Sequence, residues 1–204
     1  MTVEMRPLPR GRHGLSREEV ESSQRMRLMY AMREVMADKG YAATSVADIL
    51  RRARVSRETF YELFGSKEDC FMSAFELAYG HIMDAMTLPA DDSPPLERFS
   101  RVLESYLGAV ASDPAAARVF LVEVYAAGPS ALARRAELQR GLVESVAALT
   151  GASNEQDRFA AEALLAGLVQ MVTARVAVGD AEGLRDLHEP TVELARRLGL
   201  GSAE

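Results

Sequence analysis

The sequence predicts an all-α protein, and three observations lead to that prediction. Apolar residues recur three and four positions apart along most of the 204 residues, which is the spacing of one helix face. Two capping boxes, Ser16 with Glu19 and Ser45 with Asp48, mark helix starts. Glycines and prolines separate the periodic segments from one another. No segment alternates convincingly as a β-strand would.

The expected helices follow one another with short breaks. The first begins after Ser16 and ends near Lys39, where Gly40 stops it. Residues 1–14 are basic, rich in proline and glycine and without period, so we expect a disordered arm there. Beyond two short helices described below, the expected helices cover residues 67–87, 96–112, 115–127, 130–150, 155–178 and 190–198.

Residues 44–67 are the most informative stretch. A short helix with one apolar face ends near Arg54, and Ser56 is a cap residue that opens a second short helix. Phe60 and Phe64, four positions apart, give this second helix a narrow buried stripe. Helices of about two turns are not stable alone, so both must pack on their neighbours. The pattern is that of a helix-turn-helix, whose second helix enters the major groove of DNA.

The net charge of −6 is unevenly distributed along the chain. Residues 1–67 hold 13 Lys/Arg and 9 Asp/Glu, a net charge of +4, and residues 68–204 hold the other 11 and 21, a net charge of −10. A basic first part followed by an acidic body is expected of a protein that touches DNA at one end only. A chance imbalance of solvated charges is the alternative. The basic arm either lies in a minor groove or is an untethered tail.

The run from Gly40 to Phe71, GYAATSVADIL…VSRETFYELFGSKEDCF, resembles the DNA-binding head of the tetracycline-repressor (TetR) family of bacterial transcription regulators. The resemblance implies a helix-turn-helix domain over residues 15–67 and a helical effector-binding and dimerisation domain over residues 68–204. It also implies a dimeric repressor that binds a palindromic operator in double-stranded DNA and is released by a small effector. Two positions depart from the family pattern: Arg54 stands where the turn normally carries glycine, and Leu63 where His or Tyr is usual.

The same resemblance implies which residues contact DNA. Thr44 and Ser45, the hydroxyl of Tyr61 and the ammonium of Lys67 are expected at phosphates. Base edges are expected to be read by side chains of the second short helix, namely Arg57, Glu58, Thr59, Glu62 and Leu63. Arg57 is the best candidate for a bidentate guanine contact, and either glutamate is a candidate acceptor from a cytosine amine. Arg54, four positions before Glu58, is a candidate to neutralise that carboxylate.

The helix expected over residues 155–178 is apolar on two faces. Such a helix is either central in its own core or shared with a partner. In the TetR family the final two long helices pair with their copies, so the resemblance implies a homodimer, and burial within one subunit is the alternative. The expected interface residues are Leu164, Gly167, Leu168, Met171, Leu194 and Leu198.

The resemblance also implies an effector pocket among the body helices. Aromatic and methionine side chains with a few hydroxyl and amide groups suit an uncharged or amphipathic, largely apolar molecule. For each residue taken singly, a place in the core is the alternative. The expected pocket residues are Phe75, Tyr79, Met83, Met86, Phe99, Tyr106, Phe120, Tyr125, Gln170 and Met171.

No catalytic or cofactor motif is recognisable, so we expect neither an enzyme nor a bound cofactor. The three histidines share no metal-ligand spacing, and Cys70 is the only cysteine, which excludes a disulfide and a cysteine metal site. Glu123 lies in an apolar run and is expected either to form a structural ion pair, with Arg175 as a possible partner, or to anchor a ligand. No run of eighteen apolar residues and no signal-peptide pattern occur, so we expect a cytoplasmic protein without a membrane partner.

Two rival hypotheses belong to other functional classes. One is a helical ligand-binding module without sequence-specific operator recognition, and binding to random duplex without sequence preference would favour it. The other is a helical enzyme with an unrecognised site, and only turnover by the purified protein would support it.

Overall fold

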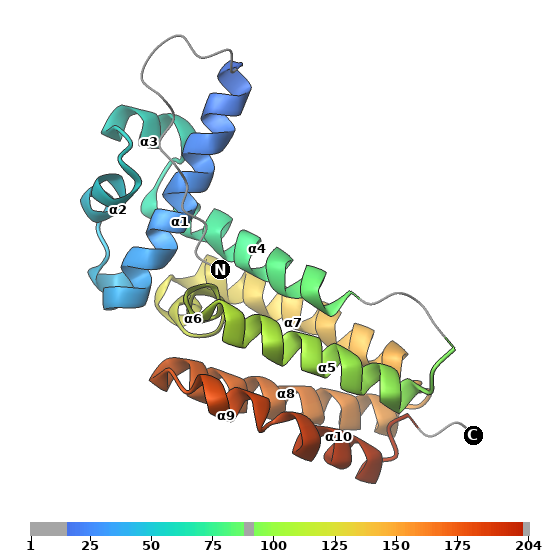
Figure 1. Cartoon of the computed structure of the whole chain (residues 1–204). Coiled ribbons are helices and arrows are strands. Elements are labelled where there is room, and N and C mark those ends of the chain that lie inside the picture. The colour runs from blue at the N-terminus through green and yellow to red at the C-terminus, as the bar shows by residue number, and fades with distance from the viewer. Residues whose placement is uncertain (1–15, 88–91, 202–204) are drawn as a thin grey trace. The chain divides into compact units, whose positions relative to one another are not determined.

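The computed structural model describes residues 16–87 and 92–201, and the arm expected over residues 1–14 lies outside them. All regular elements in these ranges are helices, which confirms the all-α fold class (Figure 1). They are α1 (Arg17–Ala43), α2 (Val46–Ala53), α3 (Arg57–Leu63), α4 (Lys67–Met86), α5 (Pro95–Ser112), α6 (Pro114–Leu121), the 3₁₀ helix η1 (Glu123–Ala126), α7 (Pro129–Thr150), α8 (Glu155–Val178), α9 (Ala181–Arg185) and α10 (His188–Arg197).

Local capping explains most helix boundaries. Both predicted capping boxes are present, at Ser16 before α1 and at Ser45 before α2. Gly40 interrupts α1 with φ 79° and ψ 165°, a conformation outside the helical region that glycine adopts without steric cost. Helix α9 was not predicted, because it has five residues and depends on the Asp180 side chain, which accepts a hydrogen bond from the Gly183 amide.

The chain divides into two compact units, Met1–Leu77 and Ala78–Glu204. The division falls inside α4, so the first unit holds more of this helix than the expected boundary at residue 67 assigned to it. The reason is visible in the packing of the first turns of α4: Cys70 and Phe71 are buried, and the Phe71 ring lies 5.1 Å from that of Tyr41.

The core of the first unit is built from the inward faces of α1 to α4. The largest fully buried side chains there are Leu28, Met32, Met36, Ile49, Phe60, Phe64, Phe71 and Phe75. Met29, Met32 and Met36 of α1 are therefore core residues. This core holds the two short helices, which are too short to be stable alone.

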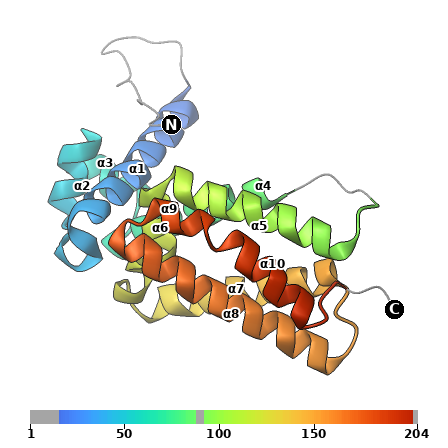
Figure 2. The ribbon, with the colours of Figure 1, turned by 60° about the horizontal axis from the view of Figure 1, so that its bottom comes forward.

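In the second unit, α8 contacts α6, α7, α9 and α10, and α5 contacts α6, α7, α9 and α10. Figure 2 shows α8 and α10 side by side. The buried cluster draws on these helices together and includes Leu103, Leu107, Val110, Leu121, Leu164, Leu168 and Val172. It is largely aliphatic.

Candidate functional site

The N-terminus of α2 is fixed by reciprocal hydrogen bonds between Ser45 and Asp48. The Asp48 amide donates to Ser45 Oγ (3.2 Å), and the Ser45 amide donates to Asp48 Oδ2 (3.0 Å). The Lys39 ammonium, 2.6 Å from the same carboxylate oxygen, and the two donors of Ser45 hold the pKa of Asp48 well below its usual range. The amide groups of Val46 and Ala47 begin the helix and point toward its N-terminal end, where an anion is favoured.

The turn between α2 and α3 depends on an arginine in a left-handed conformation. Arg54 has φ 54° and ψ 46°, and among the described residues it is the only residue other than glycine with a positive φ. For a residue with a Cβ this costs on the order of 1 kcal/mol. Arg27 of α1 offsets that cost, because its guanidinium donates to the carbonyl groups of Ala53 and Arg54.

Arg54 does not neutralise Glu58, as its position four residues earlier suggested. No ion pair joins the two within the described part of the chain. The physical reason is the turn itself: Arg54 is the C-cap of α2, whereas Glu58 lies in the first turn of α3, so the two do not share a helix face.

Helix α3 is held against α1 by two kinds of contact. Phe60 and Phe64 are fully buried, with ring centroids 5.7 Å apart. Arg25 of α1 donates to the Leu63 carbonyl at 2.7 Å, and its guanidinium lies 4.6 Å from the Phe64 ring centroid. The roles of Arg25 and Arg27 were not predicted, because arginines in the first half of a long helix are usually solvent-exposed.

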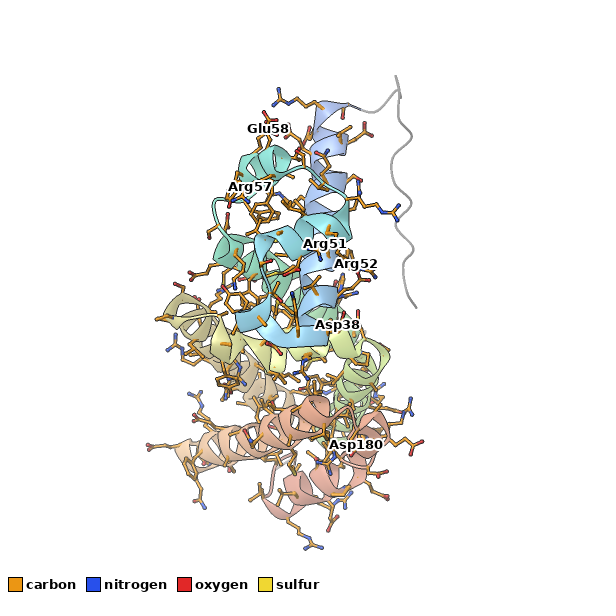
Figure 3. All side chains as sticks on the ribbon, turned by 90° about the vertical axis from the view of Figure 1, so that its left-hand side faces the viewer. Asp38, Arg51, Arg52, Arg57, Glu58 and Asp180 are labelled. Atoms are coloured by element: carbon orange, nitrogen blue, oxygen red, sulfur yellow. The ribbon has the colours of Figure 1, made fainter. Side chains whose placement is uncertain are left out.

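The opposite side of α3 is exposed. Arg57, Glu58, Tyr61 and Glu62 are exposed, whereas Thr59 and Leu63 are partly buried. Figure 3 places Arg57 and Glu58 at the surface of α3, with Arg51 and Arg52 on α2. The Arg57 guanidinium lies 5.4 Å from the Tyr61 ring centroid, and its Nη2 is 3.4 Å from the Tyr61 hydroxyl oxygen. These contacts hold the strongest base-reading candidate in an ordered position.

Two of the predicted phosphate contacts have structural partners. The Thr44 side chain is buried, and its hydroxyl donates to the Gly40 carbonyl at 2.7 Å. The Lys67 ammonium donates to the Tyr41 and Thr44 carbonyls, both at 3.0 Å, and partial burial lowers the pKa of Lys67. Two of its three donors are thus used inside the fold, which leaves one for an external phosphate.

A cavity of about 330 Å³ opens in the second unit between α4, α5 and α7. Its lining residues are Met83, Met86, Thr87, Arg98, Arg101, Val102, Leu142, Ser145, Val146 and Leu149. Of the ten predicted pocket residues, Met83 and Met86 line it. Sequence reasoning missed the arginines, because their convergence depends on how α5 is rotated toward α4 and α7.

The other predicted pocket residues lie elsewhere in relation to this cavity. Phe75, Phe99 and Tyr106 are core residues, and burial raises the pKa of Tyr106. Tyr125, Gln170 and Met171 are exposed. Tyr79 and Phe120 stack on each other with ring centroids 5.5 Å apart. These eight side chains, predicted to line an effector pocket among the body helices, are not among the lining residues of this cavity. Apolar spacing alone does not distinguish core from cavity.

An apolar stripe runs along the exposed face of α8. Its members recur at helical spacing and are Phe159, Ala163, Gly167, Met171, Ala174 and Val178, with Phe159 72% and Val178 79% exposed. Leu194 of the neighbouring α10 and Leu198, the C-cap of that helix, are also exposed. Of the predicted interface residues, Leu164 and Leu168 point instead into the subunit core, whereas Gly167, Met171, Leu194 and Leu198 lie at the surface.

Three further features bear on chemistry and location. Glu123 is buried and pairs with Arg118 at 3.0 Å rather than with Arg175, so the alternative of a structural ion pair is met by a different arginine. Across residues 16–87 and 92–201 there is no cluster of three or more potential metal ligands. By length and mean hydropathy (1.5) α8 would suffice to cross a membrane, a property it shares with core helices of soluble proteins.

Comparisons with known proteins agree with this geometry. Residues 28–74 match the family described as bacterial regulatory proteins, tetR family. A TetR-like transcriptional regulator from Rhodococcus sp. RHA1 is 26% identical, with a TM-score of 0.69 over 90% of this chain and 97% of that one. The regulator FadR from Bacillus subtilis, solved in complex with stearoyl-CoA, is 22% identical, with a TM-score of 0.70 over 87% and 99% of the two chains, and shows the same fold.

An HTH-type transcriptional regulator of Bacillus subtilis, the uncharacterized YxbF, is 27% identical over 89 residues. The matched segment covers 43% of this chain and 23% of that protein, so this likeness concerns less than half of the chain.

Proposed function

We propose that the chain is a regulatory protein of the TetR family and acts as a dimeric repressor that is released from a palindromic operator by a small effector. The observation that carries the proposal is the recognition helix. Its buried side is tied to α1 through Phe60, Phe64 and Arg25, and its opposite side exposes Arg57, Tyr61 and two glutamates. A rigidly supported helix with exposed polar side chains suits major-groove reading.

In this proposal the contacts divide by role. Phosphates are bound by the N-terminus of α2, the Tyr61 hydroxyl and the remaining donor of Lys67. These contacts fix the position and orientation of the protein on the duplex. Arg57, Glu58, Thr59, Glu62 and Leu63 face the base edges. Arg57 donates to a guanine in each half-site, and one of the two glutamates accepts a hydrogen bond from a cytosine amine.

Selection of bound sequences from a random duplex pool tests the DNA-binding proposal. The purified full chain should enrich a palindrome, and fluorescence anisotropy should then show tighter binding to it than to a scrambled duplex at every salt concentration. Equal affinity for both duplexes would overturn operator recognition and favour the alternative function.

That alternative is a helical ligand-binding module without operator recognition. Glu58 and Glu62 favour it, because both are exposed on the helix that would face a polyanion, and the expected neutralisation of Glu58 by Arg54 is not found. Like-charged groups four residues apart also destabilise a helix by a few tenths of a kcal/mol. A repressor that uses these carboxylates must read cytosine amines with them.

The exposed stripe of α8, with Leu194 and Leu198, is the proposed homodimer face. An apolar surface of this kind rimmed by polar residues is typical of an interaction site. A second copy is the proposed occupant, because an isologous interface places two recognition helices on a palindrome related by the same two-fold axis. This dimer also accounts for the hydropathy of α8 without a membrane.

The cavity between α4, α5 and α7 is the proposed effector site. Its apolar wall suits a largely apolar or amphipathic small molecule, and it borders the C-terminal end of α4. FadR of Bacillus subtilis, a protein with the same fold, was solved with stearoyl-CoA, which supports a search among amphipathic compounds. We propose no catalytic role and no cofactor, and we propose the cytoplasm as the compartment.

Effector action is tested by a thermal-shift screen of apolar and amphipathic compounds on the full chain. Each hit is then titrated with and without operator DNA. Coupling of about 1–3 kcal/mol between the two ligands is expected, and it must be reciprocal. A hit with the same affinity in both titrations is not an effector, and if all hits behave so, the proposal of release fails.

A further inference from the structure

The cavity between α4, α5 and α7 combines an apolar wall with two arginines. The apolar wall consists of Met83, Met86, Val102, Leu142, Val146 and Leu149. Arg98 and Arg101 lie three positions apart on α5 and therefore share a helix face, which is the face turned to the cavity. The lining residues, all within the described ranges, include no aspartate or glutamate.

Arg98 has an unsatisfied donor at this site. Its Nε is buried and has no hydrogen-bond acceptor among the residues that the structure describes. A guanidinium remains charged at all ordinary pH values, so it cannot avoid the cost of burial by losing a proton. A buried donor without an acceptor is unfavourable, and an acceptor supplied by a ligand removes that cost.

The hydroxyl groups of the lining do not compete for the role of donor. Thr87 Oγ1 donates to the Met83 carbonyl at 3.0 Å, and Ser145 Oγ donates to the Gly141 carbonyl at 2.9 Å. Their protons are thus used within their own helical segments. Arg98 supplies the donor that remains for a ligand, so the polar end of the ligand must accept hydrogen bonds and is best matched by a negative charge.

We propose that the effector is an amphipathic anion, with its apolar part on the methionine and leucine wall and its carboxylate or phosphate on Arg98 and Arg101. This inference rests on the proposed function in that it takes the cavity as the effector site. The planar, two-pronged guanidinium binds either head group. A volume of about 330 Å³ lies at the lower end of ligand sites, which span roughly 300–1,000 Å³, so the apolar part is of medium length.

Three ten-carbon probes test the proposal: decanoate, decyl phosphate and decanol, each below its micelle-forming concentration. Isothermal titration on the full chain should give at least one anion a dissociation constant lower than that of decanol by a factor of about ten or more. Added salt should weaken binding of the anion and leave decanol unchanged. Whichever anion binds tighter identifies the head group as carboxylate or phosphate.

Matched variants assign the charge effect to the two arginines. Arg98→Met and Arg101→Met should each raise the dissociation constant of the preferred anion by about tenfold and leave decanol binding unaltered. Arg140→Met removes an exposed arginine of α7 outside the lining and should change neither value. Decanol binding shows that the cavity is intact. A variant that loses anion binding but still binds decanol is therefore folded. If Arg98→Met does not fold, two other measurements decide whether the arginine binds the head group: the affinity of Arg98→Lys for the anion, and the salt dependence of anion binding by the unsubstituted protein.

Two results overturn the proposal. If decanol and both anions bind equally and independently of salt, the cavity is an apolar effector site that has no preference for an anionic head group. Absence of binding by all three probes would remove the amphipathic anion altogether. The proposed function fails separately, if a ligand that does bind has the same affinity in the presence and absence of operator DNA.

Discussion

Arginine side chains have several different roles in this molecule. Arg27 donates to carbonyl groups around the left-handed turn, Arg25 ties the C-terminal end of α3 to α1, and Arg57 lies at the exposed side of α3. Arg98 lines a cavity, and its buried Nε has no hydrogen-bond acceptor among the described residues. The same residue type thus supports the fold in the first unit and marks candidate ligand contacts in both units.

Arg57→Ala should relax base preference at one position in each half-site and reduce the free energy of operator binding by about 1–3 kcal/mol there. The reason is the loss of a bidentate donor pair to one base. Competition binding with operators substituted at single positions measures it. Arg51→Ala, an exposed arginine of α2, is the control and should leave the preference intact. If Arg57→Ala leaves the base preference unchanged, α3 does not read the bases as proposed.

Lys67→Met should act on both stability and DNA binding. It removes two hydrogen bonds from an ammonium to the Tyr41 and Thr44 carbonyls, and we expect the free energy of unfolding to fall by about 1–3 kcal/mol. If its third donor holds a phosphate, the slope of log affinity against log salt should also fall in magnitude by about 1. Urea unfolding and salt titrations measure the two effects. A reduced stability with an unchanged slope would limit Lys67 to the fold.

At the scale of the element, α2 depends on its cap more than on its length. Eight residues are too few for an isolated helix, so the reciprocal bonds of Ser45 and Asp48 and the buried side chains of Ile49 and Ala53 must hold it. Replacing Ser45 by alanine is expected to cost about 0.5–2 kcal/mol. The cap also places the two residues that begin the proposed phosphate site.

Asp48→Asn should make the stability of the protein less dependent on pH. The pKa of Asp48 is lowered in the fold, first by the hydrogen bond from Lys39, so its carboxylate stabilises the protein above the unfolded-state pKa of about 4. That contribution is lost as the pH falls through the folded-state pKa. Urea unfolding between pH 3 and pH 7 should therefore show the largest difference from the variant near neutral pH, narrowing below roughly pH 4. Asp38→Asn, an exposed carboxylate of α1, is the control. A difference that is constant with pH would contradict the assignment.

At the scale of the whole molecule, the proposed activity requires two copies. A monomer presents one recognition helix, and a palindrome needs two related by a two-fold axis. The exposed apolar face of α8 is the surface on which the second copy is proposed to pack, and its character is consistent with an interface that is buried in the functional assembly.

Gly167→Arg tests the dimer without threatening the subunit. A Cβ added at Gly167 meets no neighbouring atom within 4 Å in the single subunit, and the position is exposed, so an arginine can extend into solvent there but obstructs close approach of a second α8. Analytical ultracentrifugation should show monomers, and tight binding to the palindrome should be lost. Gly108→Arg, on α5 and equally open within the subunit, is the matched control and should remain dimeric. An intact Gly167→Arg dimer would place the interface on another surface.

The sequence by itself determined the features that depend on near neighbours along the chain. Ser45 with Asp48, Ser56, Gly40 and the pair Phe60–Phe64 act within four or five residues, so the helix-turn-helix and the all-α class could be predicted from them.

Only the tertiary structure decided how each helix is rotated about its axis. That rotation turns Leu164 and Leu168 inward and Gly167 and Met171 outward, pairs Glu123 with Arg118, and ties Lys67 to two carbonyls. It also brings Arg98 and Arg101 to a cavity with residues from α4 and α7. A helix that is apolar on two sides has no unique inward face until its neighbours pack on it, so periodicity alone does not settle which residues form the core, the cavity or the interface.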